Sequence, residues 1–300
     1  MRLREIADSA KIAVCRDGDF QNLGFIPDRQ EHMLVFLESA RHRTALAENK
    51  SIGVVLTTQE LAPSIPDKLA LGVCIDPRLT FARVHSDLAQ KHFYWEPFTT
   101  AVSPLASVHP ASWVAERNVR IGADARVDPR ATILERCLVG TGAVIGAGAV
   151  LGGVGFQTVR AKRAMLELQH AGGLIIQDRV HVLPGAVIAT GLFRQCTVIS
   201  ADARIGSQAF VSHGVQVGER AFIGHGAVIN GNVIIGDDAW IGPGAVIANN
   251  IRIGERAFVS LGAAVIRDVA AGSHVSGSFA ASHRQMLRLL ADMESGSPAR

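Results

Sequence analysis

Aliphatic residues recur every six positions along the second half of the chain. From residue 199 to residue 269 the repeat runs through twelve hexads without a slip, at positions 199, 205, 211, 217, 223, 229, 235, 241, 247, 253, 259 and 265. A period of six is not the 3.6-residue repeat of a helix, but it is a multiple of the two-residue repeat of extended chain. Frequent glycine, with valine and isoleucine in phase, also disfavours helix. The pattern predicts a parallel β-helix in which three hexads form one triangular coil and the aliphatic residues stack inward.

The same phase extends toward the N-terminus. It is present at 121, 127, 133, 139, 145 and 151, and again at 176, 182 and 188, with weaker repeats at Val108 and Val114. Residues 157–173 break the period, which predicts an excursion loop. The step from 188 to 199 is one residue short of two hexads and predicts a local irregularity. We therefore expect a β-helix over residues 107–270 with about seven to eight coils, roughly 35 to 40 Å long.

The two ends of the chain follow other patterns. Residues 1–100 alternate helical and strand-like segments, with helices expected at 3–10 and 79–92 and buried strands at 53–57 and 71–75, which predicts a small α/β domain. A linker is expected at 99–107. Apolar residues with helical spacing, after a capping-box start, predict a C-terminal helix over 280–294.

Composition narrows the function classes. The net charge of +3 is too small to indicate a nucleic-acid partner, although Arg160, Lys162 and Arg163 form a basic cluster that is either solvated or contacts phosphate or an acidic carrier. The four cysteines show neither disulfide nor metal-site spacing. We expect no transmembrane segment and no signal peptide, and hence a cytoplasmic protein.

Two histidines, His213 and His225, occupy the third position of their hexads, which is a turn or surface position rather than a core position. One coil holds 18 residues, so Gly231 is expected beside His213 on the next coil. A glycine there can offer a backbone N–H beside an imidazole base. A base next to an oxyanion donor is suited to acyl transfer. His225 is expected at the surface of a different face.

Several motifs in order resemble one family over nearly the whole chain. They are VFL at 35–37, GVVLT at 53–57, DPRLTFAR at 76–83, GGVGF at 152–156, HAGGLII at 170–176 and FVSHGVQVG at 210–218. The chain resembles the UDP-3-O-acylglucosamine N-acyltransferases (LpxD) of lipid A biosynthesis, which are hexapeptide-repeat acyltransferases. The departures described below mark it as a divergent paralogue.

The resemblance implies a fold, a reaction and an assembly. The fold is a left-handed parallel β-helix behind a small α/β domain that binds uridine, and the assembly is a homotrimer with active sites between subunits. The reaction moves an acyl chain from acyl carrier protein to the amine of a UDP-linked amino sugar, with no metal and no cofactor beyond the acyl thioester. His213 matches the catalytic base and Gly231 the oxyanion donor.

The resemblance also implies substrate-binding positions, some of which carry other residues here. Phe36 matches a phenylalanine that stacks on uracil, while His42 and Ser39 replace a tyrosine and an asparagine. His170 follows the excursion loop and is a candidate substrate contact. Asn250 replaces a histidine expected near the substrate.

A further departure concerns the base itself. Gly206 and Ser207 stand where the family has an Asp-Asn pair before the histidine. If that carboxylate orients the imidazole, its loss leaves the tautomer of His213 less defined.

Three alternatives follow from the same residues. An acetyl-CoA-dependent sugar N- or O-acetyltransferase would differ in donor and acceptor. Arg284 and Arg288 of the C-terminal helix favour docking of a carrier protein as the donor over acetyl-CoA. A non-catalytic nucleotide-sugar binding protein would explain the departures as lost activity. A γ-type carbonic anhydrase needs an H-x4-H spacing that the sequence does not contain.

Overall fold

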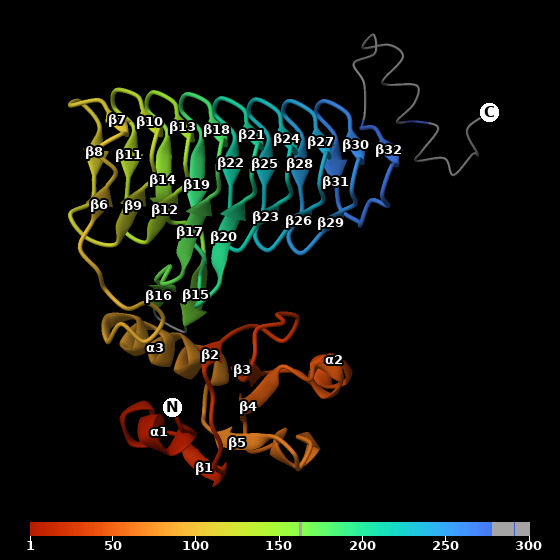
Figure 1. The fold of residues 1–300 in the computed structure, drawn as a ribbon. Helices are drawn as coiled ribbons and strands as arrows, with labels where there is room; N and C mark the ends of the chain where they lie inside the picture. Colours follow the sequence, from red (N-terminus) through yellow and green to blue (C-terminus); the bar gives the residue numbers. More distant parts are fainter. Residues whose placement is uncertain (162–163, 278–290, 292–300) are drawn as a thin grey trace.

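A computed structural model describes residues 1–161, 164–277 and 291. It consists of an N-terminal α/β domain and a long β-helix that lies beside it (Figure 1). Apart from residue 291, the predicted C-terminal helix over 280–294 lies outside these residues, as do Lys162 and Arg163 of the basic cluster. None of the described helices is long and apolar enough to cross a membrane.

The N-terminal domain is a five-stranded sheet covered by helices. Its sheet has the order β1-β5-β4-β3-β2, with β1 antiparallel to β5 and the other pairs parallel. The strands are β1 (Ala13–Arg16), β2 (Asn22–Leu23), β3 (Met33–Leu37), β4 (Ile52–Thr57) and β5 (Ala70–Val73). The helices are α1 (Leu3–Ala10), α2 (Arg43–Glu48) and α3 (Pro77–Gln90), with the short 3-10 turns η1 (Ala40–His42) and η2 (Ala62–Ser64). The helices predicted at 3–10 and 79–92 and both predicted strands are present in this domain.

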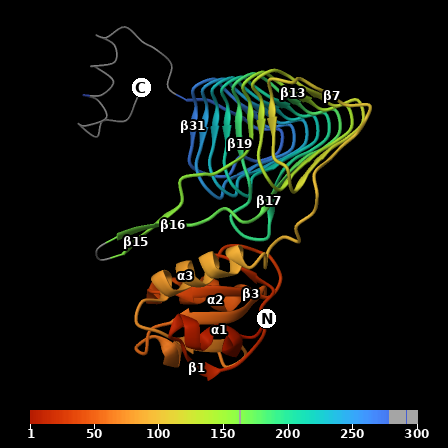
Figure 2. The same ribbon diagram turned by 90° about the vertical axis from the view of Figure 1, so that its left-hand side faces the viewer.

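The second part is a parallel β-helix with three flat faces, as predicted (Figure 2). Face 1 consists of β6 (Ala101–Val102), β9 (Val119–Ile121), β12 (Cys137–Val139), β17 (Gly173–Ile176), β20 (Cys196–Ile199), β23 (Gln216–Val217), β26 (Ile234–Ile235) and β29 (Arg252–Ile253). Face 2 consists of β7 (Ser107–Val108), β10 (Arg126–Val127), β13 (Val144–Ile145), β18 (His181–Val182), β21 (Arg204–Ile205), β24 (Phe222–Ile223), β27 (Trp240–Ile241), β30 (Phe258–Val259) and β32 (His274–Val275). Face 3 consists of β8 (Trp113–Val114), β11 (Thr132–Ile133), β14 (Val150–Gly153), β19 (Val187–Ala189), β22 (Phe210–Val211), β25 (Val228–Ile229), β28 (Val246–Ile247) and β31 (Ala264–Val265).

The phased aliphatic residues form the core of the prism. Every one of them from Ile121 to Val265 is buried, together with the small apolar residue four positions later in each regular hexad. The side chains of one strand stack on those of the next coil, so the core is a continuous column rather than a set of separate clusters. With nine strands on face 2, the β-helix is slightly longer than the seven to eight coils predicted.

The boundaries of the β-helix differ from those predicted. β6 at Ala101–Val102 already pairs with β9, so the first coil begins within the expected linker 99–107. At the other end β32 at His274–Val275 pairs with β30, beyond residue 270. The residues of both terminal strands are exposed or half-buried. These strands need no aliphatic residue at the phased position, so the hexad pattern does not reveal them in the sequence.

Both breaks in the hexad repeat fall at the same corner, where the chain passes from face 3 to face 1. The excursion loop contains a two-stranded antiparallel hairpin of β15 (Thr158–Ala161) and β16 (Ala164–Glu167). Ile188 and Ile199 lie on the successive strands β19 and β20, so this step of 11 residues is a single hexad of six with five extra residues, all within 190–195. It is not two hexads with one residue missing, as the sequence had suggested.

These two insertions attach the N-terminal domain to the prism. Val159 and Leu168 of the excursion loop and Phe193 of the second insertion belong to the same buried cluster as Phe81 of α3. The Phe193 ring lies 5.3 Å from the ring of Phe25 and 5.7 Å from that of Phe81. The irregular segments therefore bury apolar surface that the regular coils cannot supply, and they fix the domain over the 3–1 corner (Figure 1).

Candidate functional site

His213 lies at the 3–1 corner, in the turn between β22 and β23. Its side chain is only 8% exposed, although the third position of a hexad is a turn position. The backbone around it is fixed by the next coil, because the His213 carbonyl accepts a hydrogen bond from the Asn232 N–H at 2.9 Å. The backbone that carries the imidazole is therefore fixed at this corner.

Gly231 lies directly against this imidazole, as the 18-residue coil predicts. A Cβ atom on residue 231 would stand 2.6 Å from both Nε2 and Cε1 of His213. Atoms do not approach so closely, so any side chain at 231 would displace the imidazole. The structure brings the predicted base and the predicted oxyanion donor together, while their catalytic roles stay predictions.

The hydrogen-bonding partner of His213 is its neighbour Ser212. The Ser212 hydroxyl lies 3.1 Å from Nδ1 of His213, and both side chains are buried. When Nδ1–H donates to this hydroxyl, the lone pair of Nε2 is left free on the side of Gly231. The hydroxyl thus supplies an orienting contact that the sequence had suggested was lost.

The positions that hold Asp-Asn in the resembled family lie elsewhere within one chain. Gly206 and Ser207 are at the corner between faces 2 and 3, where the Ser207 N–H donates to Nδ1 of His225 at 3.0 Å. A carboxylate at residue 206 would therefore stand beside His225 and not beside His213 of the same chain. His225 is exposed on a different corner, as its sequence position predicted.

His170 lies beside His213. Their ring centroids are 5.5 Å apart at a steep angle, and Nε2 of His170 accepts a hydrogen bond from the Gly155 N–H at 3.0 Å. His170 also lines a cavity of about 630 Å³ formed with the excursion loop, whose walls include Arg136, Phe156 and Leu168. The predicted substrate contact thus lies between the base and a cavity.

Burial keeps both imidazoles neutral. The pKa of His170 is lowered to about 4, first by burial and then by the nearby His213. The pKa of His213 is also lowered from its ordinary value, because burial disfavours the charged form. At neutral pH His213 is therefore unprotonated and able to accept a proton.

A polar cleft of about 480 Å³ opens beside this corner, between the β-helix and the N-terminal domain. The β-helix contributes Gln195, Asn232, Asn250 and Arg252, and the domain contributes residues 27–30. The Oε1 atom of Gln195 is buried without a hydrogen-bond partner among the described residues. The predicted substrate-binding residue Asn250 thus lines a cleft that is suited to a ligand with many hydrogen-bonding groups.

Asp28 is the carboxylate of this cleft. Burial raises its pKa to about 6, and the hydrogen bond donated to Oδ2 by the Phe25 N–H at 2.8 Å counteracts only part of that effect. The carboxyl group therefore changes charge near neutral pH at the entrance of the cleft.

The predicted uracil-binding residues lie in the N-terminal domain. Phe36 is half-buried, and its ring packs 5.1 Å from that of Phe81 while the Arg78 guanidinium lies 5.7 Å from its centroid. His42 is exposed and accepts a hydrogen bond from Nε of Arg41 at 2.9 Å, and Ser39 precedes η1. None of the three residues lines the cleft or the cavity described above, and a role in binding uracil stays a prediction.

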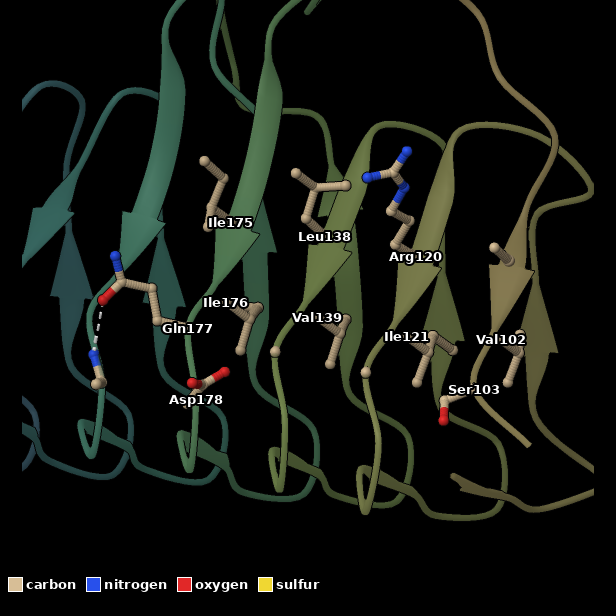
Figure 3. A pocket seen from close by; sticks show the side chains of 14 residues that line it. Val102, Ser103, Arg120, Ile121, Leu138, Val139, Ile175, Ile176, Gln177 and Asp178 are labelled. Atoms are coloured by element: carbon tan, nitrogen blue, oxygen red, sulfur yellow. Dashed lines mark hydrogen bonds between the residues drawn. The ribbon is translucent and has the colours of Figure 1, made fainter. Parts of the chain in front are cut away.

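A third depression is a shallow groove of about 620 Å³ on face 1. It runs over strands β6, β9, β12 and β17 and the turns that follow them. Figure 3 shows Arg120, Leu138 and Ile175 side by side on neighbouring strands, with Gln177 and Asp178 at the rim. Its floor is apolar and holds none of the predicted site residues. Across the described residues no three His, Cys, Asp or Glu side chains converge as metal ligands would.

Two residues of the site were missed by the sequence analysis. Ser212 directly precedes His213, but only the turn geometry shows that its hydroxyl reaches Nδ1. Asn249 lies 18 residues after Gly231, and its Oδ1 accepts a hydrogen bond from the Gly231 N–H at 2.9 Å. The coil length that led from His213 to Gly231 would also have led to Asn249.

Comparison with known proteins agrees with the fold. Residues 118–153, 196–231 and 232–266 match the bacterial transferase hexapeptide (six repeats) family. The fold and these repeats define a hexapeptide-repeat β-helix protein.

Within that class the sequence is similar to UDP-3-O-acylglucosamine N-acyltransferases, which confirms the resemblance read from the motifs. The enzyme of Herminiimonas arsenicoxydans is 23% identical over 78% of this chain and 75% of its own length, and that of Pseudomonas fluorescens is 25% identical over 77% and 73%. Among solved structures, the UDP-N-acetylglucosamine acyltransferase of Francisella novicida aligns with a TM-score of 0.49 and 20% identity over 63% of this chain and 73% of that chain. The identities mark the chain as a divergent relative.

Proposed function

We propose that the protein is an N-acyltransferase that moves an acyl group from a thioester carrier to the amine of a UDP-linked amino sugar, as in lipid A biosynthesis. The contact between the His213 imidazole and Gly231 carries the proposal, because it places a neutral base beside a backbone with no side chain. The similarity to UDP-3-O-acylglucosamine N-acyltransferases supports the choice of reaction.

The chemistry follows from these two residues. Nε2 of His213 takes a proton from the sugar amine as the amine nitrogen bonds to the thioester carbon. The carbonyl oxygen becomes an oxyanion and accepts a hydrogen bond from the Gly231 N–H. When the carbonyl reforms, the carbon–sulfur bond breaks and the thiolate takes the proton from the imidazolium. No covalent intermediate on the enzyme is needed.

The polar cleft supports a nucleotide-sugar acceptor. Asn232 and Asn250 offer amide groups at the corner, and Arg29 and Arg252 offer cationic groups suited to phosphate. The acceptor sugar would then lie between the N-terminal domain and the β-helix with its amine toward His213. A carrier protein is the proposed donor, with a coenzyme A thioester as the alternative.

A homotrimer is part of the proposal. The outward-facing row of face 3 carries no charged residue along its length, from Trp113 through Thr132, Val150, Val187, Phe210, Val228 and Val246 to Ala264. The corresponding rows of faces 1 and 2 contain Arg120, Arg126, Arg204 and Arg252. Face 3 ends at the corner of His213, so a second copy packed on it would close the site. Light scattering should give three copies for the wild type and for Phe258→Asp on face 2, and fewer for Phe210→Asp.

The test of the activity is an acyl-transfer assay with a panel of UDP-amino sugars and acyl donors on carrier protein or coenzyme A. Mass spectrometry of the product should show an amide on the sugar nitrogen, formed equally well by the control variant His225→Ala. An ester product or a preference for acetyl-CoA would favour the acetyltransferase alternative. Binding of UDP-sugar without turnover by any pair would favour a non-catalytic binding protein.

A further inference from the structure

The N–H group of Gly231 is already occupied in the structure. It donates to Oδ1 of Asn249, one coil further on, at 2.9 Å. A backbone N–H can only donate, so Asn249 must present its carbonyl oxygen and not its amide nitrogen. An acyl oxyanion at this N–H would compete with the Asn249 oxygen for the same hydrogen.

The two partners differ in their surroundings. Gly231 is buried and its backbone is held by the next coil, because its carbonyl accepts a hydrogen bond from the Asn250 N–H at 3.0 Å. The Asn249 side chain is exposed at the corner. Rotation of this side chain into water would therefore free the N–H without moving any backbone.

The same contact recurs at other corners, where it has only a structural role. Oδ1 of Asp237 accepts from the Glu219 N–H at 2.8 Å, and Oδ1 of Asp178 accepts from the Thr141 N–H at 2.8 Å. These pairs tie one coil to the next. The pair at Gly231 differs because it lies against the His213 imidazole and because its acceptor is a neutral amide, which binds an N–H less strongly than a carboxylate does.

We propose that Asn249 is a positioning residue that occupies the oxyanion donor of the free enzyme and releases it when the acyl thioester reacts. This role rests on the proposed function. As the amine nitrogen bonds to the thioester carbon, the carbonyl electron pair moves to oxygen, and this oxygen replaces Asn249 Oδ1 on the Gly231 N–H. A neutral amide allows the exchange, whereas a carboxylate at 249 would hold the N–H and repel the oxyanion.

Three variants separate this role from a structural one. Asn249→Ala removes the acceptor, Asn249→Asp retains it with a charge, and Asp237→Ala removes the equivalent contact at a distant corner. Thermal unfolding and kcat are measured for each with the donor and acceptor on which the wild type is active. Loss of one such hydrogen bond should lower Tm by about 1–3 °C in Asn249→Ala and in Asp237→Ala.

Stability and activity should not change together in the variants of residue 249. Asn249→Ala should be less stable than the wild type but have a kcat equal to it or up to about fivefold higher. Asn249→Asp should keep the wild-type Tm but lose at least about tenfold in kcat, while Asp237→Ala keeps full activity.

Either of two results would show that the proposed role of Asn249 is wrong. A kcat of Asn249→Asp within twofold of the wild type, or a kcat of Asn249→Ala more than twofold below it, would show that Asn249 does not compete with the oxyanion. If the proposed function itself is wrong, the wild type shows no turnover with any pair of acyl donor and amino-sugar acceptor. The proposed role of Asn249 is then wrong as well.

Discussion

The imidazole of His213 and the backbone of Gly231 pack so closely that residue 231 has no room for a side chain. A Cβ atom there would lie 2.6 Å from Nε2 of His213. The two residues are 18 positions apart in the sequence, and the stacking of one coil on the next brings them together.

Replacement of Gly231 by alanine should move the base. The new methyl group forces the imidazole away from the acceptor amine, and a displacement of about 1 Å can cost on the order of 100-fold in rate. We expect kcat of Gly231→Ala to fall by about that factor in the transfer assay. Gly244→Ala is the control, because residue 244 has open space for a Cβ but a φ of +67°, which alanine adopts only with strain. It should lose stability and keep its activity. Similar kcat values for both variants would argue against the contact.

Ser212 should orient the base. Loss of its hydroxyl leaves Nδ1 of His213 without the contact at 3.1 Å, so the imidazole is held less firmly and fewer molecules present Nε2 toward the amine. Ser212→Ala should lower kcat about tenfold with little change in Tm, and Ser212→Thr should recover most of the loss. If Ser212→Thr is as slow as Ser212→Ala, the hydroxyl has no orienting role.

The rate should depend on pH in a particular way. His213 acts as a base only when it is neutral, and burial lowers its pKa below the ordinary 6.5. The ionisation of His213 should therefore appear in kcat/KM as a rise with pH below pH 6.5, separate from the loss of a proton by the substrate amine at higher pH. An inflection above pH 6.5 that stays in place when the substrate is exchanged for one with a different amine pKa would mean that another enzyme group sets the protonation state of the active enzyme.

Asp28 should destabilise the fold at neutral pH. Its pKa is about 6 in the folded protein, and the ordinary value is 3.8, so the folded state holds a proton that the unfolded chain has lost. Stability from this group is present below pH 3.8 and is lost as the pH rises to 6. Asp28→Asn keeps an acceptor for the Phe25 N–H and should gain up to about 3 kcal/mol in the free energy of unfolding at pH 7.5, with little gain at pH 4. Urea unfolding at both pH values measures this difference, and an equal gain at both would contradict the assigned pKa.

The regular parts of the molecule could be predicted from the sequence because each residue there has one dominant role. Ile121, Ile205 and Ile241 are phased because they fill the prism, and the same phase placed Gly231 beside His213. The irregular segments were harder to predict from the sequence. Nothing in the hexad pattern indicates that Phe193 would leave the coil to join the core of the N-terminal domain. This contact depends on a partner more than a hundred residues away.

The direction of single polar atoms was also beyond the pattern, although the coil length places residue 249 next to Gly231. Ser212 and Asn249 each touch the proposed machinery through one oxygen atom, and the direction of a side chain in a turn depends on local dihedral angles. The resemblance placed both Asn250 and Phe36 near the substrate. In the structure Asn250 lines the polar cleft, whereas Phe36 packs on Phe81 within the domain.

The most direct measurement is the turnover of His213→Ala beside the wild type and His225→Ala, with one UDP-amino sugar and one acyl thioester. His213 is buried against Gly231, and His225 is exposed at another corner. We expect kcat of His213→Ala to fall by about 100- to 10,000-fold, with His225→Ala close to the wild type. Unchanged turnover in a folded His213→Ala protein would show that the base lies elsewhere.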